Sequence, residues 1–431
     1  MISLVRTLHF ASLISLTGSL TFLLFILKSP DTPRFLIRMC WASLALVLAS
    51  GVAWLILEAQ SMSGQPLDAI FSRGVIGVVL TRTRFGWDWS ARAILGVLLI
   101  LCLRQKGRPF LWGTWLASLA LLGTMAGAGH AAANANPLHL GADFIHLIAA
   151  GAWVGGLLPL AWALARSPQA EAAATTSRFG LMGVICVGAI LVSGIVNTWY
   201  LAGTIPALIG TEYGHLLLFK IALFLVMCVI AAINRWRLTP YLSSSLSALA
   251  GLRRNALLEA GFGIGVLIVL GSLGTTPPGL HTEPWWPFSF RLDLDAPPSA
   301  MIVEAFPTSF YHAPIAFSAL SIRRGAAVYD ENCTQCHGAS GHGDGPLAKT
   351  LQTPPADLTE PHLLAHKEGD LFWWIAEGIA SSGMPGFAES LSEGQRWDAI
   401  NFLRARAAGI NAHDLRPTVG SSPAPLAPDF T

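Results

Sequence analysis

Long apolar stretches dominate the first two thirds of this 431-residue chain, and polar residues gather in the segments between them. A hydrocarbon core about 30 Å thick requires roughly 20 apolar residues in an α-helix that rises about 1.5 Å per residue. Eight stretches meet this requirement, although the third is short. We therefore expect a bundle of eight transmembrane helices within residues 1–275, and we see no internal repeat among them. The predicted helices cover residues 7–27, 35–57, 89–104, 109–129, 140–165, 178–201, 215–236 and 256–275.

The last third of the chain has a different pattern. Residues 276–316 contain eight prolines and the run PWWPFSF, which is typical of an extended connector with aromatic residues at the membrane interface. Residues 317–411 are typical of a soluble helical domain, and we expect residues 412–431 to form a disordered tail. The predicted fold class is all-α, a polytopic bundle followed by a soluble domain.

Composition and charge support a membrane location. Apolar residues make up 53% of the chain and charged residues 12%, whereas an ordinary soluble domain is about 25% charged. The net charge of +2 argues against nucleic acid as a partner. Loops after odd-numbered helices carry twelve Lys and Arg residues, and the opposite side carries four. Because cytoplasmic loops are enriched in these residues, we expect both termini and the soluble domain in the periplasm.

The sequence ENCTQCHGASGHGDG contains the pattern C-x-x-C-H, formed by Cys333, Cys336 and His337. This pattern attaches a c-type haem through two thioether bonds, and the histidine ligates the iron. Met384, in SSGMPGF, offers a thioether as the second axial ligand. A zinc knuckle or a redox dithiol uses similar spacing, but zinc would need two further ligands and His342 is the only nearby candidate.

The order of features across residues 317–411 resembles class I cytochrome c domains: a helix, C-x-x-C-H, a Gly-rich loop, Met-Pro and a closing helix. The resemblance implies one haem c attached to the two cysteines, axial ligation by His337 and Met384, and one-electron transfer. It further implies that Gly325 lies where the first and last helices cross. Pro346 is expected to supply the carbonyl that orients the iron-ligating imidazole.

Five histidines fall at or near the outer ends of the predicted membrane helices. Ionisable groups inside a bilayer are costly, so each is a functional candidate. Neutral imidazoles near a carboxylate such as Asp143 suit copper and could equally ligate a b-type haem, so both possibilities stay open. The alternative for each is an interfacial side chain satisfied by water, and Lys220 is expected to pair with Asp143. The candidate copper ligands are His9, His130, His139, His146 and His215.

The membrane part is similar to the copper resistance D family over predicted helices 4 to 8, and TRFGWDWSAR fits the start of that family's third helix. The resemblance implies copper handling at or across the cytoplasmic membrane, without fixing a direction. The matching stretches are GHA at 129–131, DFIHLIAAGAWVGGL at 143–157, SGIVNTW at 193–199, GHLLLFKIALF at 214–224, NRWRLTP at 234–240 and LRRNALLEAGFGIGVLIV at 252–269.

The first functional hypothesis is a copper-handling inner-membrane protein, in transport or resistance, with a tethered periplasmic haem c for one-electron transfer. Its partners would be copper ions, membrane lipid and periplasmic electron-transfer or copper-carrier proteins. The second is a membrane module in which paired histidines bind haem b and pass quinol electrons to the haem c. A purely structural anchor is a third possibility, which the buried Lys220 and the layered histidines disfavour. A transporter or electron carrier fits better than a conventional enzyme.

Overall fold

A computed structural model describes the chain except for six short segments. The described residues are 1–28, 32–72, 74–105, 107–126, 136–292 and 301–410, so the predicted disordered tail lies outside them. The chain divides into two compact units. The first comprises Met1–Leu208 and Glu212–Thr282, and the second comprises Ile209–Thr211 and Glu283–Thr431.

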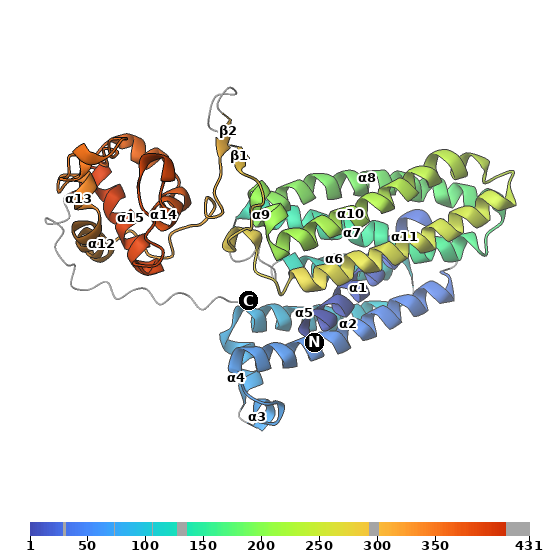
Figure 1. Ribbon diagram of the computed structural model, residues 1–431. Helices are drawn as coiled ribbons and strands as arrows, with labels where there is room; N and C mark the ends of the chain where they lie inside the picture. Colours follow the sequence, from blue (N-terminus) through green and yellow to red (C-terminus); the bar gives the residue numbers. More distant parts are fainter. Residues whose placement is uncertain (29–31, 73, 106, 127–135, 293–300, 411–431) are drawn as a thin grey trace. The chain divides into compact units, whose positions relative to one another are not determined.

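The first unit is a bundle of long helices (Figure 1). Within the described residues, eight helices are long and apolar enough to cross a membrane, which confirms the predicted all-α multi-pass fold. The spans begin with α1 (Ile2–Thr21, continued by a π-helical turn, Phe22–Ile26), α2 (Arg34–Ser63), α5 (Arg84–Arg104) and α6 (Arg108–Ala126). They continue with α7 (Pro137–Leu164), α8 (Gln169–Leu201), α10 (Glu212–Ile233) and α11 (Leu246–Leu273). Short helices α3 (Leu67–Ser72), α4 (Val75–Arg82) and α9 (Ile205–Gly210) lie between them.

All eight spans begin earlier than the predicted helices, by one residue at α2 and by as many as ten at α11. In two of them the cause is local. Helix α5 starts at Arg84 because the Thr83 side chain caps it, accepting a hydrogen bond from the Gly86 amide at 3.0 Å. Helix α8 starts at Gln169, since polar residues extend it beyond the apolar stretch. Hydropathy located the part of each helix that crosses the membrane. Capping of α5 and the polar residues of α8 set the residue at which each of these two helices begins.

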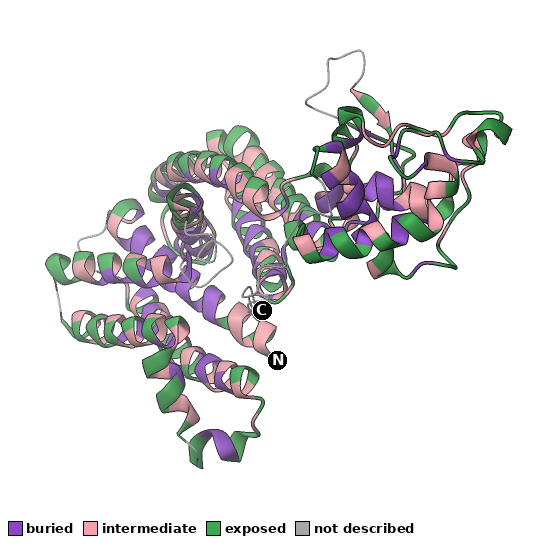
Figure 2. Cartoon of the chain, turned by 90° about the vertical axis from the view of Figure 1, so that its left-hand side faces the viewer, coloured by how far each residue is buried: buried purple, intermediate pink, exposed green. Residues whose placement is uncertain are grey.

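Helix α1 is central to the bundle and contacts α2, α6, α7 and α11. In the apolar stretch of α1 that could cross the membrane, 78% of the residues are buried, which is the highest share among the eight spans. It approaches α7 most closely at Gly18 and Gly155, where a Cβ added to either glycine would overlap the backbone of the other helix. Small residues allow membrane helices to pack backbone to backbone in this way. Figure 2 shows buried residues on the inward faces of the helices and exposed residues on the outward faces.

The described residues of the second unit form four α-helices, several 3-10 turns and a two-stranded antiparallel ribbon. Helices α12 and α15 cross at Gly325, as predicted, because an added Cβ there would overlap the backbone carbonyl of Asp398. The stacked rings of Phe372 and Trp397 lie in its core, 4.3 Å apart. The elements are β1 (Phe290–Leu292), β2 (Ile302–Glu304), α12 (Ala319–Asn332), α13 (Thr334–His337), α14 (Glu368–Glu377) and α15 (Glu393–Ala407).

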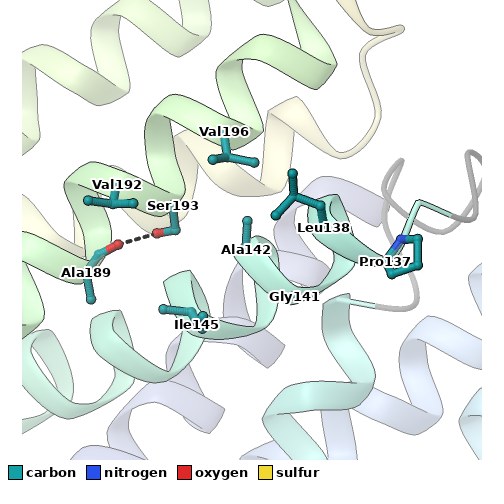
Figure 3. Close-up of a pocket in the computed structure, with 9 residues that line it drawn as sticks. All are labelled: Pro137, Leu138, Gly141, Ala142, Ile145, Ala189, Val192, Ser193 and Val196. Atoms are coloured by element: carbon teal, nitrogen blue, oxygen red, sulfur yellow. Dashed lines mark hydrogen bonds between the residues drawn. The ribbon is translucent and has the colours of Figure 1, made fainter.

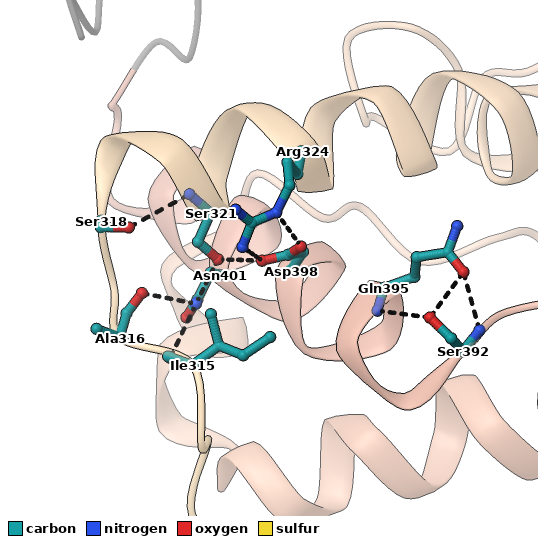
Figure 4. Close-up of polar contacts among 9 residues, drawn as sticks. All are labelled: Ile315, Ala316, Ser318, Ser321, Arg324, Ser392, Gln395, Asp398 and Asn401. Carbon is teal, nitrogen blue, oxygen red and sulfur yellow. Dashed lines mark hydrogen bonds and ion pairs between the residues drawn. The ribbon is translucent and has the colours of Figure 1, made fainter. Parts of the chain in front are cut away.

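A buried carboxylate holds the crossing of α12 and α15 together. Asp398 accepts hydrogen bonds from the Ser321 hydroxyl at 2.6 Å and from two nitrogens of Arg324 at 2.6 and 2.8 Å. Asn401 donates to the same Ser321 hydroxyl at 2.9 Å, and Ser318 caps the start of α12 (Figure 4). Burial of the carboxylate is tolerated because its oxygens are paired.

Part of the predicted connector packs on this unit. Arg291 in β1 forms a buried ion pair with Asp370 of α14 at 2.7 Å, and Ser309 donates a hydrogen bond to the same carboxylate. Thr308 donates to the backbone carbonyl of Gly369 at 2.6 Å. The described residues 301–316 therefore brace α14, whereas the sequence had indicated an extended connector.

Candidate haem and metal sites

The C-x-x-C-H motif lies at the junction of α12 and α13. Cys333 ends α12, and its amide donates to the carbonyl of Tyr329 at 2.8 Å. The single turn of α13 then carries Cys336 and His337. The Tyr329 hydroxyl donates to the carbonyl of Gly338 at 2.8 Å, which fixes the chain directly after the motif. Both thiols and the imidazole thus come from one braced segment.

The orientation of His337 comes from a hydrogen bond at its Nδ1 atom. Nδ1 lies 3.0 Å from the carbonyl of Ala356, and a carbonyl can only accept, so Nδ1 carries the hydrogen and Nε2 keeps its lone pair. The expectation that Pro346 supplies this carbonyl is wrong, because a different loop closes over the motif. Burial lowers the pKa of His337, so the ring is neutral at neutral pH, as an iron ligand requires.

The two motif cysteines do not have the character of a redox dithiol. Burial, together with the nearby Cys336, raises the pKa of the Cys333 thiol to about 11. A reactive dithiol requires a lowered pKa. No group of three or more His, Cys, Asp or Glu side chains in the described part of the chain could hold a metal ion.

Met384 lies in a tight turn after α14. Its backbone pairs with Ile379 in an antiparallel bridge, and Gly378 and Gly383 adopt positive φ angles of 79° and 75° that favour glycine. The Met384 side chain is half-buried. The turn therefore presents a thioether from a rigid loop, and the donor set of two thiols, one Nε2 and one thioether fits a covalently bound haem c.

Two tryptophans of α14 pack on Phe306, two residues after β2. Trp373 stacks on Phe306 with 6.1 Å between ring centroids, and Trp374 meets the same ring edge-on at 5.8 Å. His366 contacts Trp374 at 4.9 Å. Phe387 packs in a small cluster with Val328 and other apolar residues.

In the bundle, His9 on α1 is almost completely buried, with 2% of its surface exposed. Its Nδ1 lies 2.9 Å from the hydroxyl of Ser50 on α2. Its Nε2 is buried and has no hydrogen-bond partner among the described residues. Trp54 meets the ring edge-on, with 5.6 Å between centroids. Nε2 of His9 is therefore a buried imidazole nitrogen that makes no hydrogen bond with a described residue.

Three charged side chains contact Trp54. The Arg6 and Arg92 guanidinium groups lie 5.1 and 5.4 Å from the centre of its ring, and its Nε1 donates to Glu58 at 3.0 Å. Arg92 is buried and also donates to the hydroxyl and the carbonyl of Thr124, each at 3.0 Å. Its donors are therefore satisfied within the bundle.

His146 on α7 has a similar hydrogen bond. Its Nδ1 lies 3.0 Å from the hydroxyl of Ser193 on α8. One turn earlier on α7, Asp143 accepts a hydrogen bond from Asn197 at 3.2 Å and interacts electrostatically with Lys220. A carboxylate and an imidazole thus lie one helical turn apart, with a cation beside the carboxylate.

The other candidate histidines lie elsewhere. His139 is buried on α7 and stacks on Tyr200, with 4.8 Å between centroids. His215 is exposed in the first turn of α10. His130 lies outside the described residues. The candidates that the structure describes do not form a cluster of three or more metal ligands.

Sequence reasoning missed the serines that orient two of these histidines. Each is followed by glycine within an apolar helix, a signal that is visible but weak. Beside Ser193, a shallow pocket of about 300 Å³ between α7 and α8 is lined almost entirely by apolar side chains (Figure 3).

A second cavity, of about 590 Å³, is lined by residues of α7, α8, α10 and α11. Cys228 and the buried Glu259 both line it. Asn234 donates to Glu259 at 2.6 Å and accepts from Asn255 at 2.8 Å, at the start of a π-helical turn (Asn234–Leu238). Such turns frequently mark functional sites in helices.

Family models match three parts of the chain. Residues 1–140 match the N-terminal domain of copper resistance protein D-like proteins, residues 173–273 match copper resistance protein D, and residues 322–407 match cytochrome c.

Named relatives extend this result. The chain is 30% identical over 290 residues to the inner membrane protein YebZ of Escherichia coli, covering 63% of this chain and 97% of that protein. It is 30% identical over 263 residues to copper resistance protein D of Pseudomonas syringae pv. tomato, covering 56% of this chain and 83% of that protein. The chain belongs to the copper resistance protein D family. It is also 32% identical over 257 residues to the copper transport protein CutJ of Bacillus subtilis, covering 56% of this chain but only 46% of that relative's length.

Within this family the chain combines a copper resistance D bundle with a C-terminal cytochrome c domain, which implies a covalently bound haem c. The two copper resistance family models match residues 1–140 and 173–273, so most of α7, with His146, lies between the two matched regions. His9 and Ser50 fall in the first matched region, and Ser193 falls in the second.

Proposed function

We propose that this protein handles copper at the bacterial cytoplasmic membrane, in transport or resistance, and that its haem c domain serves one-electron transfer in the periplasm. The observation that carries the proposal is the presence of a copper resistance D bundle and a cytochrome c domain in one chain. Two named relatives are described as a copper transport protein and a copper resistance protein.

His146 is the residue that we propose as the copper ligand. Its Nδ1 faces Ser193, so Nε2 is the nitrogen with a lone pair for a metal ion. Asp143, one turn away, adds negative charge, and Asn197 holds that carboxylate in place. An imidazole with a nearby carboxylate suits copper in either oxidation state.

The haem domain supplies a matching one-electron function. The bound haem would supply an Fe(III)/Fe(II) couple, and the Cu(II)/Cu(I) couple also exchanges one electron. Met384, if it ligates the iron, would raise the haem potential and so would favour acceptance of an electron from Cu(I). Periplasmic electron-transfer or copper-carrier proteins are the partners that this chemistry calls for.

The proposed orientation follows from charge and from the number of spans. Eight crossings return the chain to the side on which it started, so the C-terminal domain shares a compartment with the N-terminus. The excess of Lys and Arg in the loops after odd-numbered helices makes those loops cytoplasmic. The outer ends of α1 and α7, which carry His9 and His146, then face the periplasm.

Metal and haem analysis of the purified protein tests the proposal. Wild type should contain copper and one haem c, and His146→Ala should lose copper while keeping its haem c. His312→Ala is the matched control, because this exposed histidine lies outside the bundle and its loss should leave copper unchanged. Absence of copper from the wild-type protein after anaerobic loading would contradict copper handling. A pyridine haemochrome spectrum that shows haem b would instead favour the quinol-linked function.

A further inference from the structure

An exposed apolar stripe leads from the run PWWPFSF into the ribbon of the second unit. It consists of Phe288, Phe290, Leu292 and Ile302, which are 45%, 43%, 49% and 71% exposed. The rings of Phe288 and Phe290 lie 5.6 Å apart, and Leu292 is the register partner of Ile302. The four side chains are therefore contiguous. Exposed apolar surface of this kind marks a contact with a partner or with lipid.

The stripe is fixed on the second unit from behind. Phe290 and Leu292 alternate with Arg291 along β1, so they lie on the face of the strand opposite to Arg291. Arg291 is buried and forms its ion pair with Asp370 of α14. Because this ion pair holds one face of the ribbon against α14, the apolar face cannot turn inward without breaking it.

Trp286 braces the start of the stripe. Its ring packs on Phe288 and on Phe310, with 5.0 and 5.3 Å between centroids. Its Nε1 donates a hydrogen bond to the carbonyl of Phe290 at 2.8 Å. The segment that leads into β1 is thus shaped by its own aromatic side chains, and it keeps Phe288 and Phe290 exposed.

The residue before this brace is tied to the start of a membrane helix. The amide of Trp285 donates to the carbonyl of Gly210 at 2.9 Å, and a Cβ added to Gly210 would overlap the backbone of Trp285. Gly210 lies two residues before Glu212, where the membrane-spanning helix α10 begins. The Trp285 side chain is 71% exposed at this point. Tryptophan is enriched at membrane–water interfaces, which fits this location.

The distance along the chain allows the stripe to reach lipid. Phe288 is three residues after Trp285, which is at most about 10 Å at about 3.3 Å per residue. The headgroup region adds about 5–8 Å on each side of the hydrocarbon core. A segment that runs along the membrane surface from Trp285 therefore brings the stripe into the headgroup region.

The charge of the segment also suits lipid. No charged residue occurs between Glu283 and Arg291, and the charge of Arg291 is paired with Asp370. Glu304, the register partner of Phe290, is exposed at the edge of the same face and can stay in water. Entry of the stripe into the headgroup region therefore removes no unpaired charge from water.

We propose that this stripe is a membrane-binding surface, which lies at the boundary between headgroups and acyl chains in the leaflet next to the second unit. It gives the cytochrome c domain a contact with the membrane in addition to its covalent link to α11. A second copy of the chain is a poorer occupant, because stable dimers bury about 800 Å² on each partner, far more than four side chains supply. The proposal does not depend on copper or on the side of the membrane.

Photo-crosslinking of the full-length protein in phosphatidylcholine vesicles tests the proposal. The amino acid p-benzoylphenylalanine, which reacts with C–H bonds that lie against it, replaces Phe290 or Leu292 in the stripe. The control position is Ser390, an exposed residue of the same unit that lies outside the stripe. Mass spectrometry after irradiation identifies what each probe has joined. Unchanged haem content shows that each protein is folded.

We expect a phosphatidylcholine adduct at both stripe positions and none at position 390. Ile302→Asp, with the probe at position 290, should abolish that adduct because it places a charge on the same face, whereas Ile302→Leu should preserve it. A probe in the stripe that reacts with protein, within one chain or between two copies, would overturn the proposal. So would equal lipid adducts at all three positions, no adduct in the stripe, or an adduct that Ile302→Asp leaves unchanged. Copper content is measured separately, so none of these results bears on the proposed function.

Discussion

The imidazole of His337 is held by a carbonyl nineteen residues further along the chain, so a loop distant from the motif orients the proposed iron ligand. That loop is itself fixed by Asp357, which accepts hydrogen bonds from His342 at 3.0 Å and from the Thr359 hydroxyl at 2.6 Å. The C-x-x-C-H motif predicted the ligand, whereas the resemblance to class I cytochrome c domains gave the wrong carbonyl, Pro346. Sequence spacing shows which residues are near the motif in the chain. The path of the Gly-rich loop determines which carbonyl lies against the imidazole of His337.

The contact between His342 and Asp357 makes stability depend on pH. The hydrogen bond and the charge of Asp357 raise the pKa of His342, and the hydrogen bonds from Thr359 and His342 lower the pKa of Asp357 to about 2. A raised histidine pKa stabilises the folded state below the unfolded value of about 6.5, and this contribution is lost as pH rises through the folded pKa. The lowered pKa of Asp357 stabilises the folded state above about pH 4. This contribution to stability is lost as the pH falls towards about 2.

We therefore expect His342→Gln to lower the free energy of unfolding at about pH 5 and to leave it unchanged at about pH 9. Urea unfolding of the full-length protein, followed by haem absorbance, measures this difference. His312→Gln removes another exposed histidine of the same unit and is the control. Equal effects of His342→Gln at both pH values would contradict the predicted linkage.

At the scale of whole helices, hydropathy was sufficient to find all eight spans, because each must present an apolar surface to lipid. It could not reveal which helices pair. Pairing depends on a few small residues, such as Gly18 and Gly155, and on single hydrogen bonds such as that from His9 to Ser50. These features occupy isolated positions in runs of similar apolar residues, so the pairing of the helices emerges only in three dimensions.

The crossing of α1 and α7 gives a prediction at this scale. Gly18→Ala places a methyl group where the backbone of Gly155 lies, and overpacking of this kind costs about 1–3 kcal/mol. Gly188→Ala on α8 is the matched control, since its added Cβ would meet no described atom within 4 Å and should change stability by less than about 0.5 kcal/mol. Unfolding in mixed micelles of increasing SDS content measures both. Equal stability of the two variants would show that the close approach of the two helices does not contribute to stability.

At the scale of the whole molecule, the sequence patterns predicted two kinds of structure, a membrane bundle and a soluble cytochrome c domain. The apolar runs predicted the membrane bundle, and C-x-x-C-H with Met384 predicted the cytochrome c domain, and the family matches confirm both. The connector was harder to predict, because its packing on α14 depends on a few side-chain contacts, such as the buried ion pair between Arg291 and Asp370 and the hydrogen bond from Thr308 to Gly369. A pattern rich in proline indicates an extended chain but does not show what that chain packs against.

The proposed function depends on a topology in which eight crossings deliver the haem c domain to the periplasmic side, where the outer ends of α1 and α7 also lie. A reporter enzyme that folds only outside the cytoplasm, fused after Thr431, tests this topology directly, with a second fusion in the loop between α7 and α8 as the opposite control. We predict full activity for the fusion after Thr431 and none for the loop fusion. An active loop fusion together with an inactive fusion after Thr431 would contradict the proposed topology.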